Sequence, residues 1–386
     1  MKKDKLKNFI NKKRCTLLGV GPMSINCVDA SIEIATEYDI PIFLIASRRQ
    51  IDSAEFGGGY VNNWTTKEFA EYVINKDKKG NIIISRDHGG PWQNNKEINQ
   101  NLSLKKAMDS AKTSFLEDIK SGFEVIHIDP SIDIHSKPTV DNILERIYEL
   151  YDFCYHQSKK LDKDILFEIG TEEQSGGTNS QEELDYILSS MQVYCKKNNL
   201  PFPTFVVIQT GTKVKEMKNV GSFDSPIRVA EQLPSEIQVP KMIEICNKYG
   251  ILMKEHNADY LSEESLYWHP RLGIHASNVA PEFGVTETKE FLKLLEENSL
   301  NVIAEEFLEL AFCSKKWEKW LLNPTFASDR EKAIIAGHYI FSTEEFLQLK
   351  EKANKELLSK NINIDEVLKD SIKNAISRYL TNFRLI

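Results

Sequence analysis

Eight short runs of branched and aromatic apolar residues recur along the chain, and they limit its fold more than any other feature. Each run is too short for a typical helix, and each is rich in Ile, Val, Leu and Phe, as buried parallel strands are. The runs that we interpret as strands cover residues 16–21, 40–47, 81–87, 123–129, 164–170, 204–210, 251–256 and 272–277.

Amphipathic stretches separate these runs. Residues 141–161, 182–199 and 227–250 carry apolar side chains at intervals of three and four, the spacing of a helix that packs one face on a core. Strand and helix in regular alternation predict an α/β fold, a (β/α)8 TIM barrel. A doubly wound open sheet is the alternative. That fold more often shows a GxGxxG turn after its first strand, and GVGPMS at 19–24 does not fit this motif.

The strand pattern stops near residue 285, and the rest of the chain is rich in Lys, Glu and Leu with helical spacing. We expect two parts, a barrel over residues 1–300 and a helical C-terminal extension over 301–386 that packs on the barrel.

Composition narrows the class of protein. The net charge of −8 disfavours a nucleic-acid partner. The sequence contains no run of 18 apolar residues, so we expect no membrane span. The basic N-terminal stretch is not followed by the apolar segment of a signal peptide. The six cysteines are dispersed and form no CxxC pair. We expect a reduced, cytoplasmic protein.

Polar side chains follow nearly every predicted strand. A barrel of this kind carries its chemistry at the C-terminal ends of the strands, so these side chains are the candidates for a site. Imidazoles and carboxylates that converge there suit a divalent ion, most simply Zn²⁺, with Mn²⁺ or Co²⁺ as alternatives. The metal ligands that we predict are His88, His256, His275 and Glu168.

Asp87 and His88 stand side by side at the end of the third run. The glycines that follow allow both side chains to reach one site, with His88 as metal ligand and Asp87 as the group that moves a proton. Asp129 and Glu172 complete the catalytic candidates, with Glu172 also considered as a ligand or as a group beside the ligands. We expect His127 to pack against the barrel wall.

Several turns could hold a phosphate through backbone N–H groups or a cationic side chain. The best placed follows the eighth run, because barrel phosphate sites often lie after strands seven and eight. The residues that we predict to bind substrate or phosphate are Arg48, Gly58, Gly59, Thr210, Gly211, Ser277 and Asn278.

A series of motifs resembles the class II D-tagatose-1,6-bisphosphate aldolase family over roughly residues 15–300. FGGGY, WTTKEFAEYV, RDHGGP, IHIDPS, EIGTEEQSGG and EHNADY occur in order. The likeness is to the branch called the non-catalytic or accessory subunit, which typically shows FGGY, GDHLGP, HLD, IGTE and E-x-H-S-T-D-Y. The resemblance implies a (β/α)8 barrel and ketose phosphate chemistry. In related catalytic aldolases it implies Zn²⁺ held by histidines, with an Asp-His pair like Asp87-His88 as base and ligand.

The sequence departs from that branch in three places. It has a third glycine in FGGGY, Arg86 before Asp-His, and His275 in GIHASN where accessory subunits read like KVGPALT. A third imidazole favours a catalyst, so the leading hypothesis is a metal-dependent aldolase acting on a phosphorylated ketose. A ketose-phosphate 4-epimerase using the same site is one alternative. A non-catalytic subunit that stabilises a partner aldolase is the other, and a homo-oligomer is also open.

Overall fold

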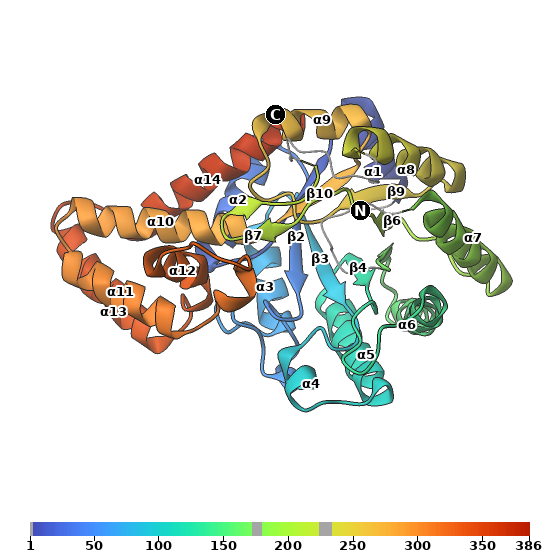
Figure 1. Cartoon of the computed structure of the whole chain (residues 1–386), viewed down its shortest axis with the longest axis horizontal. Helices are drawn as coiled ribbons and strands as arrows, with labels where there is room; N and C mark the ends of the chain where they lie inside the picture. The colour runs from blue at the N-terminus through green and yellow to red at the C-terminus, as the bar shows by residue number, and fades with distance from the viewer. Residues whose placement is uncertain (1–2, 172–179, 224–233) are drawn as a thin grey trace.

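The computed structural model describes residues 3–171, 180–223 and 234–386. Its centre is a closed barrel of parallel strands, which confirms the predicted (β/α)8 fold with a helical extension (Figure 1). The strands follow one another around the barrel in chain order, and the last closes on the first. They are β1 (Leu17–Val20), β2 (Ile42–Ser47), β3 (Ile82–Gly89), β4 (Val125–Ile128), β5 (Leu166–Ile169), β6 (Phe205–Val207), β9 (Leu252–Glu255) and β10 (Ala276–Val279).

A helix follows each barrel strand and covers it from outside. Capping side chains mark where several begin: Ser24 accepts from the backbone of Cys27, and Thr65 and Thr139 each form a capping box. The helices are α2 (Ile25–Tyr38), α3 (Thr66–Lys76), α5 (Leu104–Ser121), α6 (Val140–Lys160), α7 (Gln181–Lys197), α8 (Ser235–Tyr249), α9 (Glu263–Leu272) and α10 (Pro281–Glu297). No helix in the described ranges is long and apolar enough to cross a membrane.

Shorter elements complete the barrel part. A two-stranded antiparallel hairpin, β7 (Val214–Lys215) and β8 (Lys218–Asn219), leaves the loop after β6. The remaining elements are α1 (Lys3–Lys13), η1 (Ala54–Phe56) and α4 (Asn95–Asn99). The ammonium groups of Lys3 and Lys7 on α1 donate to carbonyls that precede β6 and β9, so α1 lies at the N-terminal end of the barrel.

The last barrel strand begins later than the sequence predicted. The apolar residues that opened the predicted strand at 272 belong to the end of α9, and Gly273 terminates that helix with φ 89°. β10 therefore starts at Ala276, four residues further on. This shift moves His275 from the mouth of the barrel to its N-terminal end.

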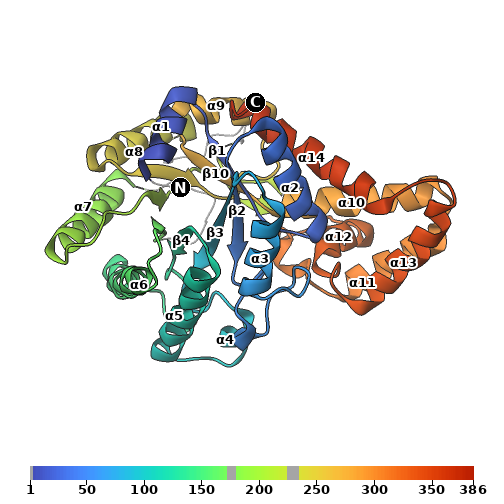
Figure 2. The same cartoon turned by 180° about the vertical axis from the view of Figure 1, so that it is seen from behind.

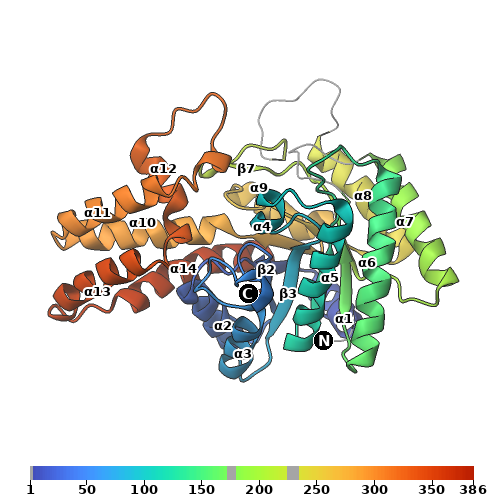
Figure 3. The same cartoon turned by 90° about the horizontal axis from the view of Figure 1, so that it is seen from below.

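The C-terminal extension stands to one side of the barrel, as Figures 1 and 3 show. It contains α11 (Asn301–Cys313), η2 (Glu318–Trp320), α12 (Asp329–Ala336), η3 (Gly337–Tyr339) and α13 (Glu344–Leu358). Its apolar core includes Phe291 of α10, Phe307 and Phe346. The division at residue 300 stays a prediction, because α10 contributes to the cores of both parts.

The final helix, α14 (Ile364–Asn382), returns to the barrel and packs on α2, α9 and α10 (Figure 2). Ile372, Ile376 and Tyr379 belong to the barrel core, and the backbone N–H of Thr16 donates to the carbonyl of Phe383. The extension is therefore tied to the barrel at both of its ends, which fixes its loops relative to the barrel mouth.

Candidate active site

A β-bulge at the end of β3 brings Asp87 and His88 to the same site. The register between β3 and β4 shifts, since Arg86 pairs with Ile126 and Gly89 with Ile128. Two residues of β3 thus stand opposite one residue of β4. His88 takes up the extra length with φ 45°, in the left-handed region. Neighbouring side chains of a regular strand point to opposite faces, and the bulge removes that restriction.

Four side chains from four different strands meet at the mouth of the barrel. Asp87, His127, Glu168 and His256 each offer one donor atom, and these atoms all lie within 4.8 Å of one another. Oδ1 of Asp87 is 3.7 Å from Nδ1 of His127 and 3.6 Å from Nε2 of His256. Oε1 of Glu168 is 3.6 Å and 3.4 Å from the same two nitrogens.

These spacings fit a small divalent cation. A tetrahedral ion with ligands at about 2.1 Å separates those ligands by about 3.4 Å. Two imidazoles and two carboxylates are a donor set that Zn²⁺, Mn²⁺ or Co²⁺ accepts. Nδ1 of His127 also accepts from the backbone N–H of His88 at 3.1 Å, so this nitrogen gives up that hydrogen bond if it binds an ion. We call these four residues the metal-ligand cluster.

A buried lysine lies beneath the metal-ligand cluster. Nζ of Lys254 is 2.7 Å from Oε2 of Glu168, and both side chains are almost fully buried. The ammonium also lies over the rings of Phe43 and Phe205 inside the barrel. Burial alone would raise the pKa of Glu168, but Lys254 and His127 lower it to about 2. Glu168 is therefore an anion with one oxygen left for the cluster.

Asp87 is also held as an anion. Burial would raise its pKa, but the neighbouring His88, His256 and His127 hold it well below its usual range. The pKa of His256 is lowered, first by burial, which favours the neutral imidazole that a metal needs. The cluster thus presents anionic oxygens and, at His256, a neutral ring.

His88 forms a second unit with Asp129 beside the cluster. Nδ1 of His88 is 2.7 Å from Oδ2 of Asp129, and Nε2 is 3.1 Å from Nδ1 of His256. Burial would lower the pKa of His88, but Asp87 and Asp129 raise it to about 9. Asp129 is fixed in turn by Ser131 and Gln93. The side chain of His88 is 32% exposed, against 1–11% for Asp87, His127 and Asp129, so its ring is the one solvent reaches most easily.

Further residues hold the cluster in place. Nδ2 of Asn278 donates to Asp87 at 3.2 Å, and the hydroxyl of Thr212 donates to the carbonyl of His256. A Cβ at Gly170 would lie 2.5 Å from Nε2 of His127, so only glycine leaves room for this ring. Thr212 belongs to the 210–212 turn that sequence reasoning considered for phosphate binding, whereas Gly170 had no assigned role. The available signal for Gly170 was its place as the last residue of the predicted strand 164–170.

His275 does not join the predicted ligand set. It precedes β10, and its backbone N–H and Nδ1 are paired with the backbone of Met253. His256 lies three residues further along β9, roughly 10 Å towards the other end of the barrel. His127, which we expected to pack as wall, lies in the cluster instead. His88 sits beside the cluster rather than within the four donors.

The predicted phosphate turns use their polar groups internally. The backbone N–H groups of Gly58 and Gly59 donate to carbonyls of Ser53 and Trp64. The hydroxyl of Thr210 donates to Glu255, and the carbonyl of Gly211 accepts from Phe223. These turns shape the mouth, and the groups named here are not free for a phosphate.

The three other residues that we predicted to bind substrate or phosphate also use their polar groups in hydrogen bonds and ion pairs within the protein. Ser277 donates to Glu255, and Asn278 donates to Asp87. Asp259 accepts from the N-terminal amides of α10, where a phosphate would have bound. Arg48 is buried against Asp52 and Glu97. Glu172 lies outside the described residues.

Comparison with known proteins bears on this site and fold. Residues 6–196 match the family model described as D-tagatose-1,6-bisphosphate aldolase subunit GatZ/KbaZ-like. This confirms the resemblance predicted from the motifs. No curated protein sequence matches the chain.

Solved structures with similar folds have low sequence identity. A probable tagatose 6 phosphate kinase from Sinorhizobium meliloti is 14% identical, with a TM-score of 0.71 over 95% of this chain and 100% of that one. The fructuronate-tagaturonate epimerase UxaE from Cohnella laeviribosi is 12% identical, with a TM-score of 0.58 over 96% and 81%. Fructose-bisphosphate aldolase from Campylobacter jejuni is 9% identical, with a TM-score of 0.57 over 100% and 96%. At these identities the likeness shows the fold alone.

Proposed function

From the resemblance of residues 6–196 to the GatZ/KbaZ-like aldolase subunit family, we propose that the chain is a metal-dependent enzyme of the aldolase type that acts on a phosphorylated ketose. The observation that carries this proposal is the metal-ligand cluster at the barrel mouth with the His88–Asp129 pair beside it. Neither feature is needed for a barrel to fold, and buried acids and imidazoles are costly unless they serve a site.

In this proposal Asp87, His127, Glu168 and His256 hold the ion. A bound divalent cation would act as a Lewis acid that draws charge onto the carbonyl oxygen of the ketose. The chain supplies the ligands on four rigid strands, which fixes the place at which that oxygen binds. Lys254 neutralises one of the two carboxylates.

His88 is the proposed proton carrier. In the aldol direction, C3 of a ketose enediolate attacks the carbon of an aldehyde, and the aldehyde oxygen takes a proton from His88 as the C3–C4 bond forms. In cleavage the same ring removes the proton from the C4 hydroxyl, and the C3–C4 bond breaks as the C4 aldehyde forms. The electron pair of that bond moves to the C2 oxygen and gives the enediolate. The carboxylate of Asp129 orients the ring and stabilises its charged form.

Two observations favour a second candidate function, that of a non-catalytic subunit. The matched family is described as an aldolase subunit, and the Lys254–Glu168 ion pair satisfies one cluster carboxylate without any metal. In that case the chain would stabilise a partner aldolase, and the metal-ligand cluster would have a structural role at the barrel mouth without binding a metal.

One experiment separates these functions. The full chain is purified after growth with added Zn²⁺, and its metal content is measured beside His256→Ala, His127→Ala and the matched control His275→Ala. About one equivalent that is lost in the first two variants and kept in the control supports the metal centre. A wild-type protein without metal would overturn the metal-dependent mechanism and favour the role of a non-catalytic subunit. The loaded protein is then incubated with ketose mono- and bisphosphates: triose products indicate cleavage, and a six-carbon epimer indicates 4-epimerisation.

A further inference from the structure

Arg49 follows the C-terminal end of the barrel strand β2, and Lys319 belongs to the C-terminal extension; neither forms an ion pair with a carboxylate of the described residues. We propose that Arg49 and Lys319 form a phosphate-binding subsite that receives the phosphate of the substrate. This inference rests on the proposed function. It assigns a binding place to the phosphate of the substrate, which the metal-ligand cluster does not bind. It also gives the C-terminal extension a direct role in substrate binding.

Arg49 stands at the barrel mouth next to the reacting groups. In the register of the barrel Ser47 pairs with Asp87, and Arg49 follows Ser47 by two residues beyond the end of β2. Arg49 therefore follows the C-terminal end of the strand that pairs with β3, which carries Asp87 and His88.

Aromatic rings connect Arg49 to Lys319. The backbone N–H of Tyr60 donates to the carbonyl of Arg49, and the ring of Tyr60 lies 4.7 Å from that of Tyr339. The ammonium of Lys319 lies 5.3 Å from the centre of the Tyr339 ring and 4.7 Å from that of Trp320. The ammonium of Lys319 therefore lies against the tyrosine pair whose other member bonds the backbone of Arg49.

The positive charges of Arg49 and Lys319 are not balanced by carboxylates within the described residues. The guanidinium of Arg49 donates to the neutral side chain of Asn95, and neither cation forms an ion pair with a described carboxylate. Lys319 is exposed to solvent. Accessible positive charge held among aromatic rings is the arrangement that binds an anion.

A buried imidazole beside the cations adds an independent observation. His338 is almost fully buried, and within the described residues neither of its ring nitrogens has a hydrogen-bond partner. Its ring lies 4.1 Å from that of Tyr339. Unpaired buried polar groups are costly in a folded protein and commonly mark a place where water or a ligand belongs.

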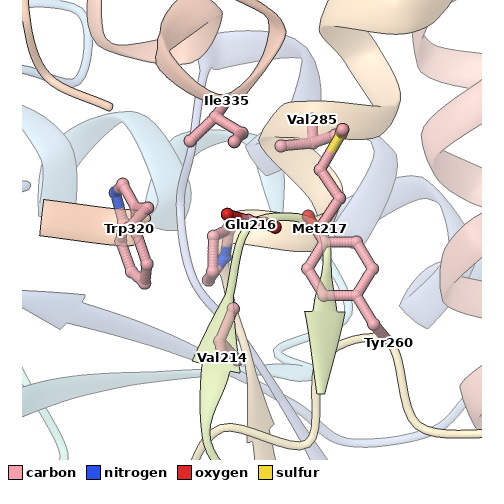
Figure 4. Close-up of a pocket in the computed structure, with 8 residues that line it drawn as sticks. Val214, Glu216, Met217, Tyr260, Val285, Trp320 and Ile335 are labelled. Carbon is pink, nitrogen blue, oxygen red and sulfur yellow. The ribbon is translucent and has the colours of Figure 1, made fainter. Parts of the chain in front are cut away.

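The segment that carries Lys319 is held firmly over the barrel. Nζ of Lys215 on the hairpin donates to the carbonyl of Lys319, and the backbone N–H of Glu216 donates to that of Trp320. Figure 4 shows Trp320 beside Glu216 and Met217 of this hairpin, in a small pocket between barrel and extension. These hydrogen bonds hold the segment of Lys319 on the hairpin that follows β6.

A phosphate matches the charges of Arg49 and Lys319 better than a carboxylate does. A phosphate dianion balances both positive charges and offers several acceptor oxygens to a guanidinium, an ammonium and the tyrosine hydroxyls. A carboxylate carries a single charge and would leave one cation unbalanced.

Binding of inorganic phosphate to the full chain tests the subsite without any need for turnover. Titration calorimetry compares the wild type with Arg49→Gln, Lys319→Gln and the matched control Lys352→Gln, which removes one exposed charge elsewhere on the extension. We expect each of the first two variants to weaken phosphate binding about tenfold and the control to bind as the wild type does. Melting temperatures show whether each variant is folded.

Equal phosphate affinity in all four proteins, no binding by the wild type, or acetate binding as tightly as phosphate would each overturn the proposal. Phosphate binding in metal-free His256→Ala separates this result from the proposed function, since the cations need no metal. If the enzyme turns over a ketose phosphate, the two variants should raise KM about tenfold with little change in kcat.

Discussion

The ammonium of Lys254 lies 2.7 Å from Oε2 of Glu168, while the other oxygen of that carboxylate faces His127 and His256. One carboxylate therefore serves two cationic partners, a resident lysine below and a candidate ion above. Since both side chains of the pair are buried, each depends on the other for compensation of its charge.

Replacing Lys254 by Met should reveal this dependence. Without metal, Glu168 would remain buried with no ammonium at Oε2, and we expect the free energy of unfolding to fall by about 3–5 kcal/mol. Saturating Zn²⁺ should recover part of that loss, because the ion would take the place of the lysine. Denaturant unfolding with and without Zn²⁺ measures both effects.

The matched control for this variant is Lys248→Met, which removes an exposed lysine from its pair with Asp185. Its cost should be much smaller than that of Lys254→Met, because water screens this exposed pair. An equally small cost for Lys254→Met would show that Glu168 does not need its lysine. A large cost that Zn²⁺ leaves unchanged would count against the metal-ligand cluster.

Asp129→Asn tests the orienting role of this carboxylate on His88. The amide keeps the shape but loses the charge that stabilises the imidazolium, so kcat on a ketose phosphate should fall about a hundredfold while metal content stays unchanged. Asp133→Asn is the control, since Asp133 lies in the same loop and pairs with Arg146 away from the cluster. Wild-type kcat in Asp129→Asn would remove the His88–Asp129 pair from the mechanism.

The barrel could be predicted from the sequence because its strands are buried on both faces and read as continuous apolar runs. The last strand could not be placed in the same way. Leu272 and Ile274 look like strand residues, but Gly273 between them ends a helix. The resulting shift of four residues is what placed His275 at the wrong end of the barrel.

The candidate site was predictable in part for a related reason. Sequence reasoning placed Asp87, Glu168 and His256 at the site because each stands at the end of an apolar run. His127 was missed because sequence alternation alone does not say which face of a strand points inwards. The glycine turns were overinterpreted, since whether the N–H groups of Gly58 and Gly59 are free depends on the loop conformation. Lys254 did carry a signal, as a lone cation within an apolar strand.

Glu287 should make stability depend on pH. This carboxyl of α10 is buried and accepts hydrogen bonds from Ser24 and Asn26. Burial is the main cause that raises its pKa to about 7, above the ordinary value of 4.5. The folded state thus binds a proton more tightly than the unfolded state. The stabilisation is complete below pH 4.5 and is lost as pH rises through 7.

Glu287→Gln should therefore be more stable than the wild type above pH 7, by up to about 3 kcal/mol, with the gain fading towards pH 4.5. Thermal or denaturant unfolding across this range measures the difference. Glu297→Gln, an exposed change on the same helix, should show little pH dependence. A constant difference between Glu287→Gln and the wild type at all pH values would refute a raised pKa.

Gly170→Ala tests the geometry of the cluster through a residue that offers no ligand. A Cβ at this position would lie 2.5 Å from Nε2 of His127 and 3.5 Å from the Cβ of Asp129, so the imidazole has to move. Because Nδ1 of the same ring is one of the four donors, we expect metal affinity to fall at least about tenfold, as measured by competition with a chelator. Gly80→Ala, at a turn with open space around it, should cost some stability but keep the metal affinity. If Gly170→Ala bound metal as the wild type does, His127 would not be a ligand, and Asp87, Glu168 and His256 would have to hold the ion without it.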